Sequence, residues 1–429
     1  AGDWSSAARA WTDAAAAAAR AFANTEAVEL LSKAVGAARS ADDVTQLVHT
    51  LVRRGRAWSQ IGRYADAVAD HEQALELARG RDDPELEALA LEQLGWTALY
   101  ARDAMAAVDL AEQATELAES AAAAPGALPS ATLLLGRVRH WDGDYDGAGE
   151  AYERVLGSDP GDPTTAVALA YRGALLQHLD RFAEARTVLA RAAALCRRTG
   201  EFRPLLQTLF FTALARGDSG DFSGALRALD NARRLIDAEK LGFYRAGIET
   251  ATSWLWQELG NPHRARDHAD AAVELARRGG GALELEQELH ALLALADCHL
   301  LLGNDDTAAD LVTAAAPTLD RSLPFKPRAA MRYLEMRARW QPDHADALLT
   351  EARLYSSPKY EALALAALGR HDEAAQVAAR TRSDLVIGQL GTPAQRGAAL
   401  ARIAESLPVE LRETFGRSGR LVIERPRTS

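Results

Sequence analysis

Small apolar residues recur along the chain in pairs seven positions apart, and the pairs advance by about forty residues. The pairs are Ala27/Ala34, Ala67/Ala74, Ala107/Ala114, Ala148/Val155, Ala185/Ala192, Ala225/Ala232, Ala265/Ala272 and Ala308/Ala315. Seven residues make two turns of an α-helix, so both members of a pair lie on one helix face, where small side chains let a neighbouring helix approach closely. A period in this range is typical of a solenoid of stacked helical repeats.

A short polar turn precedes most of these pairs. The turns are Gly62-Arg63-Tyr64, Gly143-Asp144-Tyr145, Asp180-Arg181-Phe182, Gly220-Asp221-Phe222, Gly260-Asn261-Pro262 and Gly303-Asn304-Asp305. Glycine commonly ends one helix, and aspartate or asparagine commonly caps the next. Each repeat is therefore predicted to be a helix, a tight turn and a second helix, which makes the fold class all-α.

Two repeats carry a fuller signature. One contains Leu135, Gly136, Gly143, Tyr145, Ala148, Tyr152 and Pro160, and the other contains Gly55, Trp58, Gly62, Tyr64, Ala67 and Ala74. This arrangement resembles the tetratricopeptide repeats (TPR), although Arg139 stands where an aromatic residue is expected. The resemblance covers roughly residues 4–380. It implies a right-handed superhelix of helix pairs, whose inner wall binds partners, and such folds serve many functions.

The repeats are expected over residues 1–381, with about eight clear repeats up to residue 316 and two degenerate ones after it. The degenerate repeats are aligned by Pro342 with Ala347 and by Gly369 with Ala374. Residues 382–416 are predicted to form C-terminal capping helices that start at Thr392-Pro393 and Leu407-Pro408. The basic tail, 417–429, is predicted to be flexible and not a nucleic-acid site.

The composition fits a helical array, with 48% hydrophobic and 25% charged residues. No uncharged stretch is long enough to cross a bilayer, the first residues lack the features of a signal peptide, and only Cys196 and Cys298 are cysteines. These features predict a cytoplasmic protein without a disulfide framework. A net charge of −11 opposes binding to phosphate backbones, so direct nucleic-acid binding is not expected.

One segment fits a calcium-binding loop. Asp142, Asp144, Asp146, Gly147 and Glu153 match the pattern D-x-D-x-D-G-x5-E. The same segment contains the turn of the best TPR match, which would make residues 146–153 helical and unable to wrap around an ion. The turn interpretation is favoured, and neither a metal nor a cofactor is predicted.

Other short motifs also fall on repeat turns or helices. Gly217-Asp218-Ser219-Gly220 resembles the nucleophile segment of trypsin-like proteases, but it occupies a turn between two predicted helices. His263 and His268 are five residues apart, which places them on different sides of a helix. No Walker loop, H-E-x-x-H or G-x-S-x-G motif occurs. The sequence therefore predicts no enzyme.

The TPR resemblance also implies where a ligand would lie. In TPR folds the groove-facing positions lie on the first helix of each repeat. In this chain the resemblance places the following residues there: Arg56, Trp96, Tyr100, Arg137, His140, Trp141, Tyr171, His178, Phe210, Phe211, Trp254 and Glu258. Aromatic side chains offer flat apolar faces, and the polar groups among them can orient a ligand. The alternative is that these aromatic side chains pack between helices, because an error of one residue rotates a side chain by about 100°.

A second resemblance concerns context. Ala1-Gly2-Asp3-Trp4, Ala21-Phe22-Ala23-Asn24-Thr25-Glu26-Ala27 and Leu30-Leu31 are similar to the start of the helical-repeat region of bacterial STAND signalling ATPases, including relatives of the maltotriose-responsive transcription activator. This resemblance implies a sensor region that binds a protein, a peptide or a small-molecule inducer, with any ATPase outside this chain. The alternative function is a passive scaffold or self-association domain, so a homo-oligomer is a further option.

Overall fold

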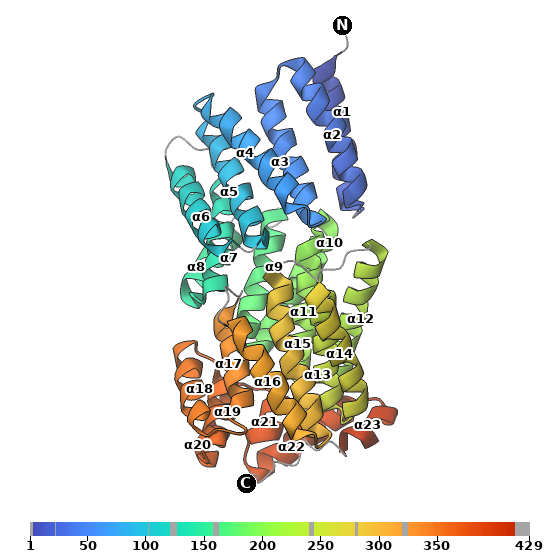
Figure 1. The fold of residues 1–429 in the computed structure, drawn as a ribbon, viewed down its shortest axis with the longest axis vertical. Coiled ribbons are helices and arrows are strands. Elements are labelled where there is room, and N and C mark those ends of the chain that lie inside the picture. Colours follow the sequence, from blue (N-terminus) through green and yellow to red (C-terminus); the bar gives the residue numbers. More distant parts are fainter. Residues whose placement is uncertain are drawn as a thin grey trace. The chain divides into compact units, whose positions relative to one another are not determined.

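The computed structural model describes residues 3–21, 23–101, 103–120, 127–157, 163–239, 244–278, 282–319 and 325–416. Within these ranges the chain forms 23 α-helices and no β-strand, so the predicted all-α solenoid class is confirmed (Figure 1). The predicted tail, 417–429, and Pro160 of the best-matching repeat lie outside the described residues.

The helices alternate with short turns along the described chain. Their bounds are α1 (Trp4–Arg20), α2 (Asn24–Ala41), α3 (Val44–Gln60), α4 (Tyr64–Arg79), α5 (Pro84–Ala101), α6 (Ala104–Glu119), α7 (Ala127–Asp142), α8 (Tyr145–Leu156), α9 (Pro163–His178), α10 (Phe182–Thr199), α11 (Phe202–Asp218), α12 (Phe222–Glu239), α13 (Arg245–Glu258), α14 (Pro262–Arg278), α15 (Ala282–Leu301), α16 (Asp305–Leu319), α17 (Lys326–Arg337), α18 (Asp343–Leu354), α19 (Pro358–Ala367), α20 (His371–Arg380), α21 (Asp384–Leu390), α22 (Pro393–Ser406) and α23 (Val409–Gly416).

The chain divides into two compact units. Unit 1 comprises residues 1–171 and 192–205, and unit 2 comprises residues 172–191 and 206–429. Within each unit, consecutive helices pack as pairs, for example α3 with α4 in unit 1 and α13 with α14 in unit 2. Because each pair also packs on the next, the core runs along the stack of repeats.

The predicted alanine pairs form the contacts between the helices. All eight pairs, including Val155, are at most 1% exposed. The predicted turns are also confirmed, since the glycines at 62, 143, 220, 260 and 303 all have φ between 77° and 98°. Glycine adopts this left-handed conformation without the steric penalty that other residues incur.

Gly136 explains how α7 approaches α8 so closely. A Cβ atom at this position would lie 2.8 Å from the Cβ of Ala151 and 3.0 Å from the Tyr152 ring. Tyr152 is fully buried there. The glycine of the best-matching repeat therefore makes room for the aromatic side chain of the same repeat.

The alignment predicted after residue 316 is wrong in one repeat. Ala347 is exposed, whereas Ala345 and Ala352 are at most 1% exposed and lie seven residues apart on α18. The spacing from Ala308 to Ala345 is 37 residues, so the alanine pairs extend one repeat farther than predicted. The segment around Pro342 concealed this pair, because proline and its neighbours carry no helical periodicity.

The calcium-loop match adopts the turn structure predicted for it. Asp142 ends α7, and Asp144 caps α8 by accepting a hydrogen bond from the Gly147 backbone N–H at 2.9 Å. Residues 145–156 are helical, so Asp146 and Glu153 lie along a helix and do not surround a common point.

Every helix in the described part of the chain is too short or too polar to span a bilayer.

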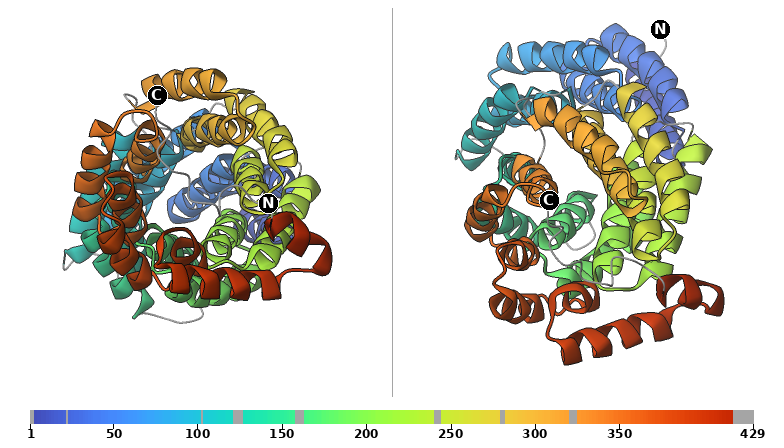
Figure 2. Two further views of the ribbon diagram at one scale, coloured as in Figure 1. Left: turned by 90° about the horizontal axis from the view of Figure 1, so that it is seen from below. Right: turned by 60° about the horizontal axis from the view of Figure 1, so that its bottom comes forward.

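The C-terminal helices of unit 2 fold back onto earlier helices of the same unit. Lys359 of α19 and Ser383 of α21 bond to Asp218 at the end of α11, and Ile403 of α22 lies against Gly220 just after it. Figures 1 and 2 show these C-terminal helices in orange to red. Phe415 of α23 packs on Phe222 of α12 with ring centroids 6.0 Å apart. Unit 2 therefore combines contacts between neighbouring repeats with contacts that join its first and last helices.

Candidate functional site

An aromatic cluster lies on α5 and α9 of unit 1. Trp96 of α5 stacks on Tyr100 of the same helix, with centroids 5.9 Å apart, and on Tyr171 of α9, with centroids 5.8 Å apart. The hydroxyl oxygens of Tyr100 and Tyr171 are 3.2 Å apart. Trp96 and Tyr100 remain partly exposed, whereas Tyr171 is buried. We call these three residues the aromatic cluster.

Two arginines lie over the faces of these rings. The guanidinium carbon of Arg137 is 4.3 Å from the centroid of Tyr171, and that of Arg203 is 4.9 Å from the centroid of Tyr100. Arg203 also donates a hydrogen bond to the carbonyl of Ser59 at 2.6 Å. Stacking of a guanidinium on an aromatic face restricts the motion of both groups.

Glu92 orients the tryptophan. One of its carboxylate oxygens accepts hydrogen bonds from Trp96 Nε1 at 2.9 Å and from the Ser130 hydroxyl at 2.7 Å. Glu92 is only 4% exposed, so its hydrogen bonds offset the cost of burying a carboxylate. The indole plane is thereby held in one orientation with one part accessible to solvent.

The other predicted groove residues of unit 1 lie in different surroundings. His140 is fully buried and contacts the rings of Tyr145 and Tyr152 edge to face. Trp141 is 6% exposed. Arg56 is exposed, and its guanidinium lies 3.9 Å from the carboxylate of Glu201. Arg56 is therefore the accessible member of this group, while His140 and Trp141 are interior residues.

The predicted groove residues of unit 2 form two groups. His178 and Phe211 are buried and contact each other edge to face at 5.3 Å, and Phe210 packs on Phe211 at 5.4 Å. In the second group, Trp254 Nε1 donates a hydrogen bond to Glu258 at 3.2 Å. Residues of the C-terminal helices cover both groups.

Phe325, which precedes α17, contacts His178 edge to face at 5.0 Å. From α19, the ammonium group of Lys359 lies 5.7 Å from the centroid of a Trp254 ring. From α21, Gln389 donates a hydrogen bond to Glu258 at 3.2 Å. His178, Trp254 and Glu258, which were predicted to face the groove and which we call the inner wall of unit 2, are thus in contact with segments of their own chain.

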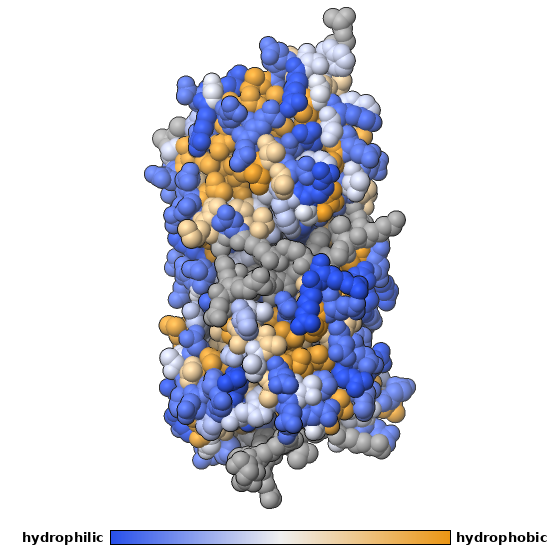
Figure 3. All heavy atoms as spheres, viewed as in Figure 1, coloured by the Kyte–Doolittle hydropathy of each residue, from blue (hydrophilic) through white to orange (hydrophobic). Residues whose placement is uncertain are grey.

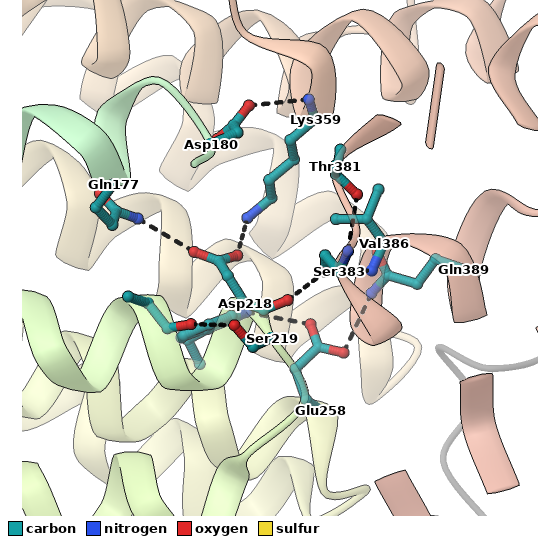
Figure 4. Close-up of polar contacts among 12 residues, drawn as sticks. Gln177, Asp180, Asp218, Ser219, Glu258, Lys359, Thr381, Ser383, Val386 and Gln389 are labelled. Atoms are coloured by element: carbon teal, nitrogen blue, oxygen red, sulfur yellow. Dashed lines mark hydrogen bonds and ion pairs between the residues drawn. The ribbon is translucent and has the colours of Figure 1, made fainter. Parts of the chain in front are cut away.

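Asp180 is the centre of a buried polar network in unit 2. Its carboxylate accepts a hydrogen bond from the Ser357 hydroxyl at 2.6 Å. It also accepts one from the Lys359 backbone N–H at 2.9 Å (Figure 4). It also pairs with Arg328 at 3.1 Å. The Asp180 side chain is fully buried, so all of these bonds form away from water.

Asp218 extends this network to α19 and α21. The ammonium group of Lys359 lies 2.5 Å from one Asp218 carboxylate oxygen, and Gln177 donates to the other at 3.1 Å. The hydroxyl of Ser383 donates to the Asp218 backbone carbonyl. Figure 4 shows Lys359 extending between Asp180 and Asp218. We call Asp180, Asp218, Arg328, Ser357, Lys359 and Ser383 the clasp.

The carboxylates keep the buried cations charged. Burial is the largest single influence and would lower the pKa of Lys359, but Asp218, Tyr360 and Asp180 together outweigh it and raise this pKa above its usual value. Burial likewise opposes the charge of Arg328, and Asp180 raises its pKa. Two acids and two bases therefore form a compensated group of buried charges.

No motif in the sequence pointed to the clasp or to Arg203. Their partners lie up to 179 residues away, so no local motif connects them. The sequence differs at one of these residues, because Asp180 stands where other repeat turns have glycine. In the structure Asp180 adopts the same left-handed conformation, with φ of 57°. The conformation alone is not a signal, because Asp42 and Asp82 also adopt it and are exposed, whereas Asp180 is buried.

A shallow surface hollow of about 450 Å³ lies over α14–α16. Val273, Leu292, Leu295 and Leu311 contribute apolar atoms to it, and Glu274 and Arg277 are among its charged residues. Figure 3 shows hydrophobic side chains among hydrophilic ones in this part of unit 2. None of the predicted groove residues lines this hollow.

No known protein-family profile matches the chain, and no curated protein is similar to it in sequence. Solved structures are similar in fold. A Rap protein complexed with Competence and Sporulation Factor has a TM-score of 0.55 and 13% identity, covering 86% of this chain and 99% of that one. Human IFIT1 with m7Gppp-AAAA has a TM-score of 0.48 and 14% identity, covering 94% and 87% of the two chains. The apo form of RapI has a TM-score of 0.47 and 12% identity, covering 63% and 97%.

The likeness to the Rap structure agrees with the successive helix pairs and turn glycines described above. The chain therefore has the fold of a TPR-like α-solenoid protein. At these levels of identity the likeness concerns the fold, and the function has to be argued from the surfaces of this chain.

Proposed function

We propose that this chain is a non-catalytic binding and regulatory module whose ligand is a protein or peptide segment that contacts the inner helices of unit 1. The aromatic cluster is the observation that carries this proposal. Trp96 and Tyr100 are partly exposed, yet Glu92 and Arg203 hold them in fixed orientations. Rigid, partly exposed aromatic side chains contribute much of the binding energy in protein interfaces because they lose little conformational freedom on binding.

Charged groups near the cluster would orient such a segment. Arg56 and Glu201 present opposite charges 3.9 Å apart, and Arg56 is exposed. The similar Rap structure also contains a second molecule, named as Competence and Sporulation Factor. That complex supports a binding role for this type of fold, while the ligand of the present chain follows from its own residues.

The proposal also covers the larger protein to which this chain would belong and the type of ligand that it would bind. A sensor region of a larger STAND-type bacterial regulator fits the proposed binding role, as does a small-molecule inducer in place of a peptide. A passive scaffold is the second candidate, since partly exposed aromatic side chains also serve permanent protein contacts. The two functions differ in whether an added ligand stabilises the isolated chain.

Binding can be tested by a thermal-shift screen with a random peptide library and a metabolite library. Ligands of the aromatic cluster raise the melting temperature, and Trp96→Ala weakens their binding by at least about tenfold, as expected for an interface aromatic residue. Trp340→Ala is the matched control, because Trp340 is 37% exposed and lies in unit 2. Trp141 is unsuitable, since truncating a buried tryptophan also destabilises the fold.

Three outcomes are informative. Peptide ligands that lose affinity in Trp96→Ala but not in Trp340→Ala support the proposal. Ligands that bind both variants equally place the site elsewhere. A screen without any stabilising ligand supports the scaffold function.

A further inference from the structure

The inner wall of unit 2 already has an occupant. The wall residues His178, Trp254 and Glu258 contact Phe325, Lys359 and Gln389 respectively. Phe325 immediately precedes α17, Lys359 lies on α19 and Gln389 lies on α21, so three alternate C-terminal helices contribute to covering the wall. A ligand for this wall would compete with the chain itself.

Asp180 connects this arrangement to the formation of α19. Lys359 is in the first turn of α19, where backbone N–H groups have no acceptor within the helix. Ser357 at the N-cap makes no side-chain capping bond, and the Asp180 carboxylate accepts from the Lys359 N–H instead. Asp180 thus acts as an N-cap supplied from 179 residues earlier in the chain.

The turn that contains Asp180 is adapted to this role. The conformation at φ 57° is unfavourable for a residue with a side chain, and Gly220 occupies the corresponding position of the next repeat. The cost is offset by three bonds to the carboxylate, from Arg328, Ser357 and Lys359. The carboxylate therefore serves the contact with α17 and α19, and the turn would form more easily without it.

The clasp differs in chemistry from the packing between neighbouring repeats. Neighbouring repeats are joined by fully buried alanines such as Ala225 and Ala265. The clasp consists of ion pairs and hydrogen bonds, whose net contribution to stability is small because the groups also interact well with water. Loss of the clasp exposes polar groups to water and leaves the apolar contacts within each repeat intact.

We propose that α17–α21 form an autoinhibitory segment, which covers the inner wall of unit 2 and is released as a body when the clasp opens. This inference rests on the proposed function, in which inner helices bind ligands, and it adds a second, covered wall. A ligand that prefers the uncovered wall shifts the equilibrium toward the open state by its difference in affinity for the two states.

Hydrogen exchange on the full chain tests the opening without any ligand. The variant Asp180→Gly removes the carboxylate and retains a residue suited to the left-handed turn, so the turn itself still folds. If the segment is released as a body, exchange should accelerate at least about tenfold along α17 and α19 as well as at Lys359. Acceleration confined to Lys359 would reflect only the lost acceptor and would contradict the release. Exchange in the middle of α13 and α15 should stay unchanged.

The matched control is Asp42→Gly. Asp42 also has a left-handed conformation, with φ of 54°, but it is exposed at the end of α2 in unit 1. This control should leave exchange at Lys359 unchanged. If Asp180→Gly accelerates exchange throughout unit 2, the C-terminal helices belong to one cooperative core and the proposal is wrong. If exchange at Lys359 does not change, the clasp does not hold the segment and the proposal is also wrong.

A second measurement tests whether the wall is uncovered. The fluorescent dye ANS, which binds exposed apolar surface, should bind more strongly to Asp180→Gly than to the unmodified chain. Adding Trp254→Ala to that variant should reduce the increase at least about twofold, because Trp254 is part of the uncovered wall. An unchanged dye signal in Asp180→Gly would contradict autoinhibition.

These readouts do not depend on the ligand of unit 1. If exchange and dye binding respond as expected but no peptide binds at Trp96, the autoinhibitory segment stands and the proposed function fails. If peptides bind at Trp96 and exchange is unaffected by Asp180→Gly, the proposed function stands and the autoinhibitory segment is refuted.

Discussion

A histidine next to Gly55 shows how single residues determine packing in unit 1. His71 is fully buried, and its Nε2 lies 3.3 Å from the Val52 carbonyl oxygen. A Cβ atom on Gly55 would lie only 2.1 Å from the same nitrogen. The glycine recognised in the sequence as part of the repeat signature is thus required by the side chain of one particular histidine.

His71 predicts a loss of stability in mild acid. Burial, with a smaller contribution from Arg56, lowers the pKa of His71 from 6.5 to about 4. Below pH 6.5 the imidazole of His71 is protonated in the unfolded chain but stays neutral in the folded chain. The free energy of unfolding therefore falls as the pH is lowered, until the pH reaches about 4. The contribution amounts to about 3 kcal/mol over this range.

Urea unfolding at pH 7, 5.5 and 4.5 measures this effect. The free energy of unfolding should fall less steeply with pH in His71→Gln than in the unmodified chain, because glutamine does not titrate. Equal pH dependence of the two proteins would show that the pKa of His71 is the same in the folded and unfolded chain.

At the scale of helices, the alanine pairs were sufficient to predict the architecture. Ala67 and Ala74 lie on the buried face of α4, and Ala69 lies on its exposed face. The prediction succeeded because a small side chain is needed wherever two helices cross closely, and this requirement repeats with the helices. It misplaced the pair on α18, where the turn around Pro342 interrupts the pattern that aligns the repeats.

The pairs predict a sharp difference between two substitutions on α4. Ala67→Leu should destabilise unit 1 by about 1–3 kcal/mol, since three extra carbon atoms have to fit between closely packed helices. Ala69→Leu, on the same helix and exposed, should change stability by less than about 0.5 kcal/mol. Thermal or urea unfolding distinguishes them, and equal effects would mean that the pair does not set the helix spacing.

At the scale of the whole molecule, charge limits the range of partners. The chain has 60 acidic and 49 basic residues, and several of its arginines are engaged in ion pairs with aspartate or glutamate. This balance leaves little positive potential for contact with phosphate groups. A protein or peptide partner is therefore more consistent with the surface than a nucleic acid.

This reasoning predicts that the chain does not bind nucleic acid non-specifically. In fluorescence anisotropy with labelled single-stranded RNA or DNA at about 100 mM salt, any dissociation constant should exceed about 100 µM. Micromolar binding that weakens with added salt would contradict the prediction and direct attention to the basic residues of the C-terminal tail.

The sequence predicted the long-range architecture better than the candidate site. Local spacing is enough to define a repeat, so the turns at Gly62 and Gly143 were identified correctly. Contacts such as Arg203 with Tyr100 and Lys359 with Asp218 join residues about a hundred positions or more apart. They depend on how successive repeats rotate about the axis of the stack, and a one-dimensional pattern does not contain that rotation.

The N-cap that Asp180 supplies to α19 also bears on the order of folding. Asp180 is synthesised well before Ser357 and Lys359, so its carboxylate remains in water while the intervening repeats form from their local contacts. The acid becomes buried only when the last helices arrive with their hydroxyl, amide and cationic groups. A chain interrupted before α17 would therefore leave the carboxylates of Asp180 and Asp218 in water. Unit 2 would complete its folding only when the C-terminal helices form.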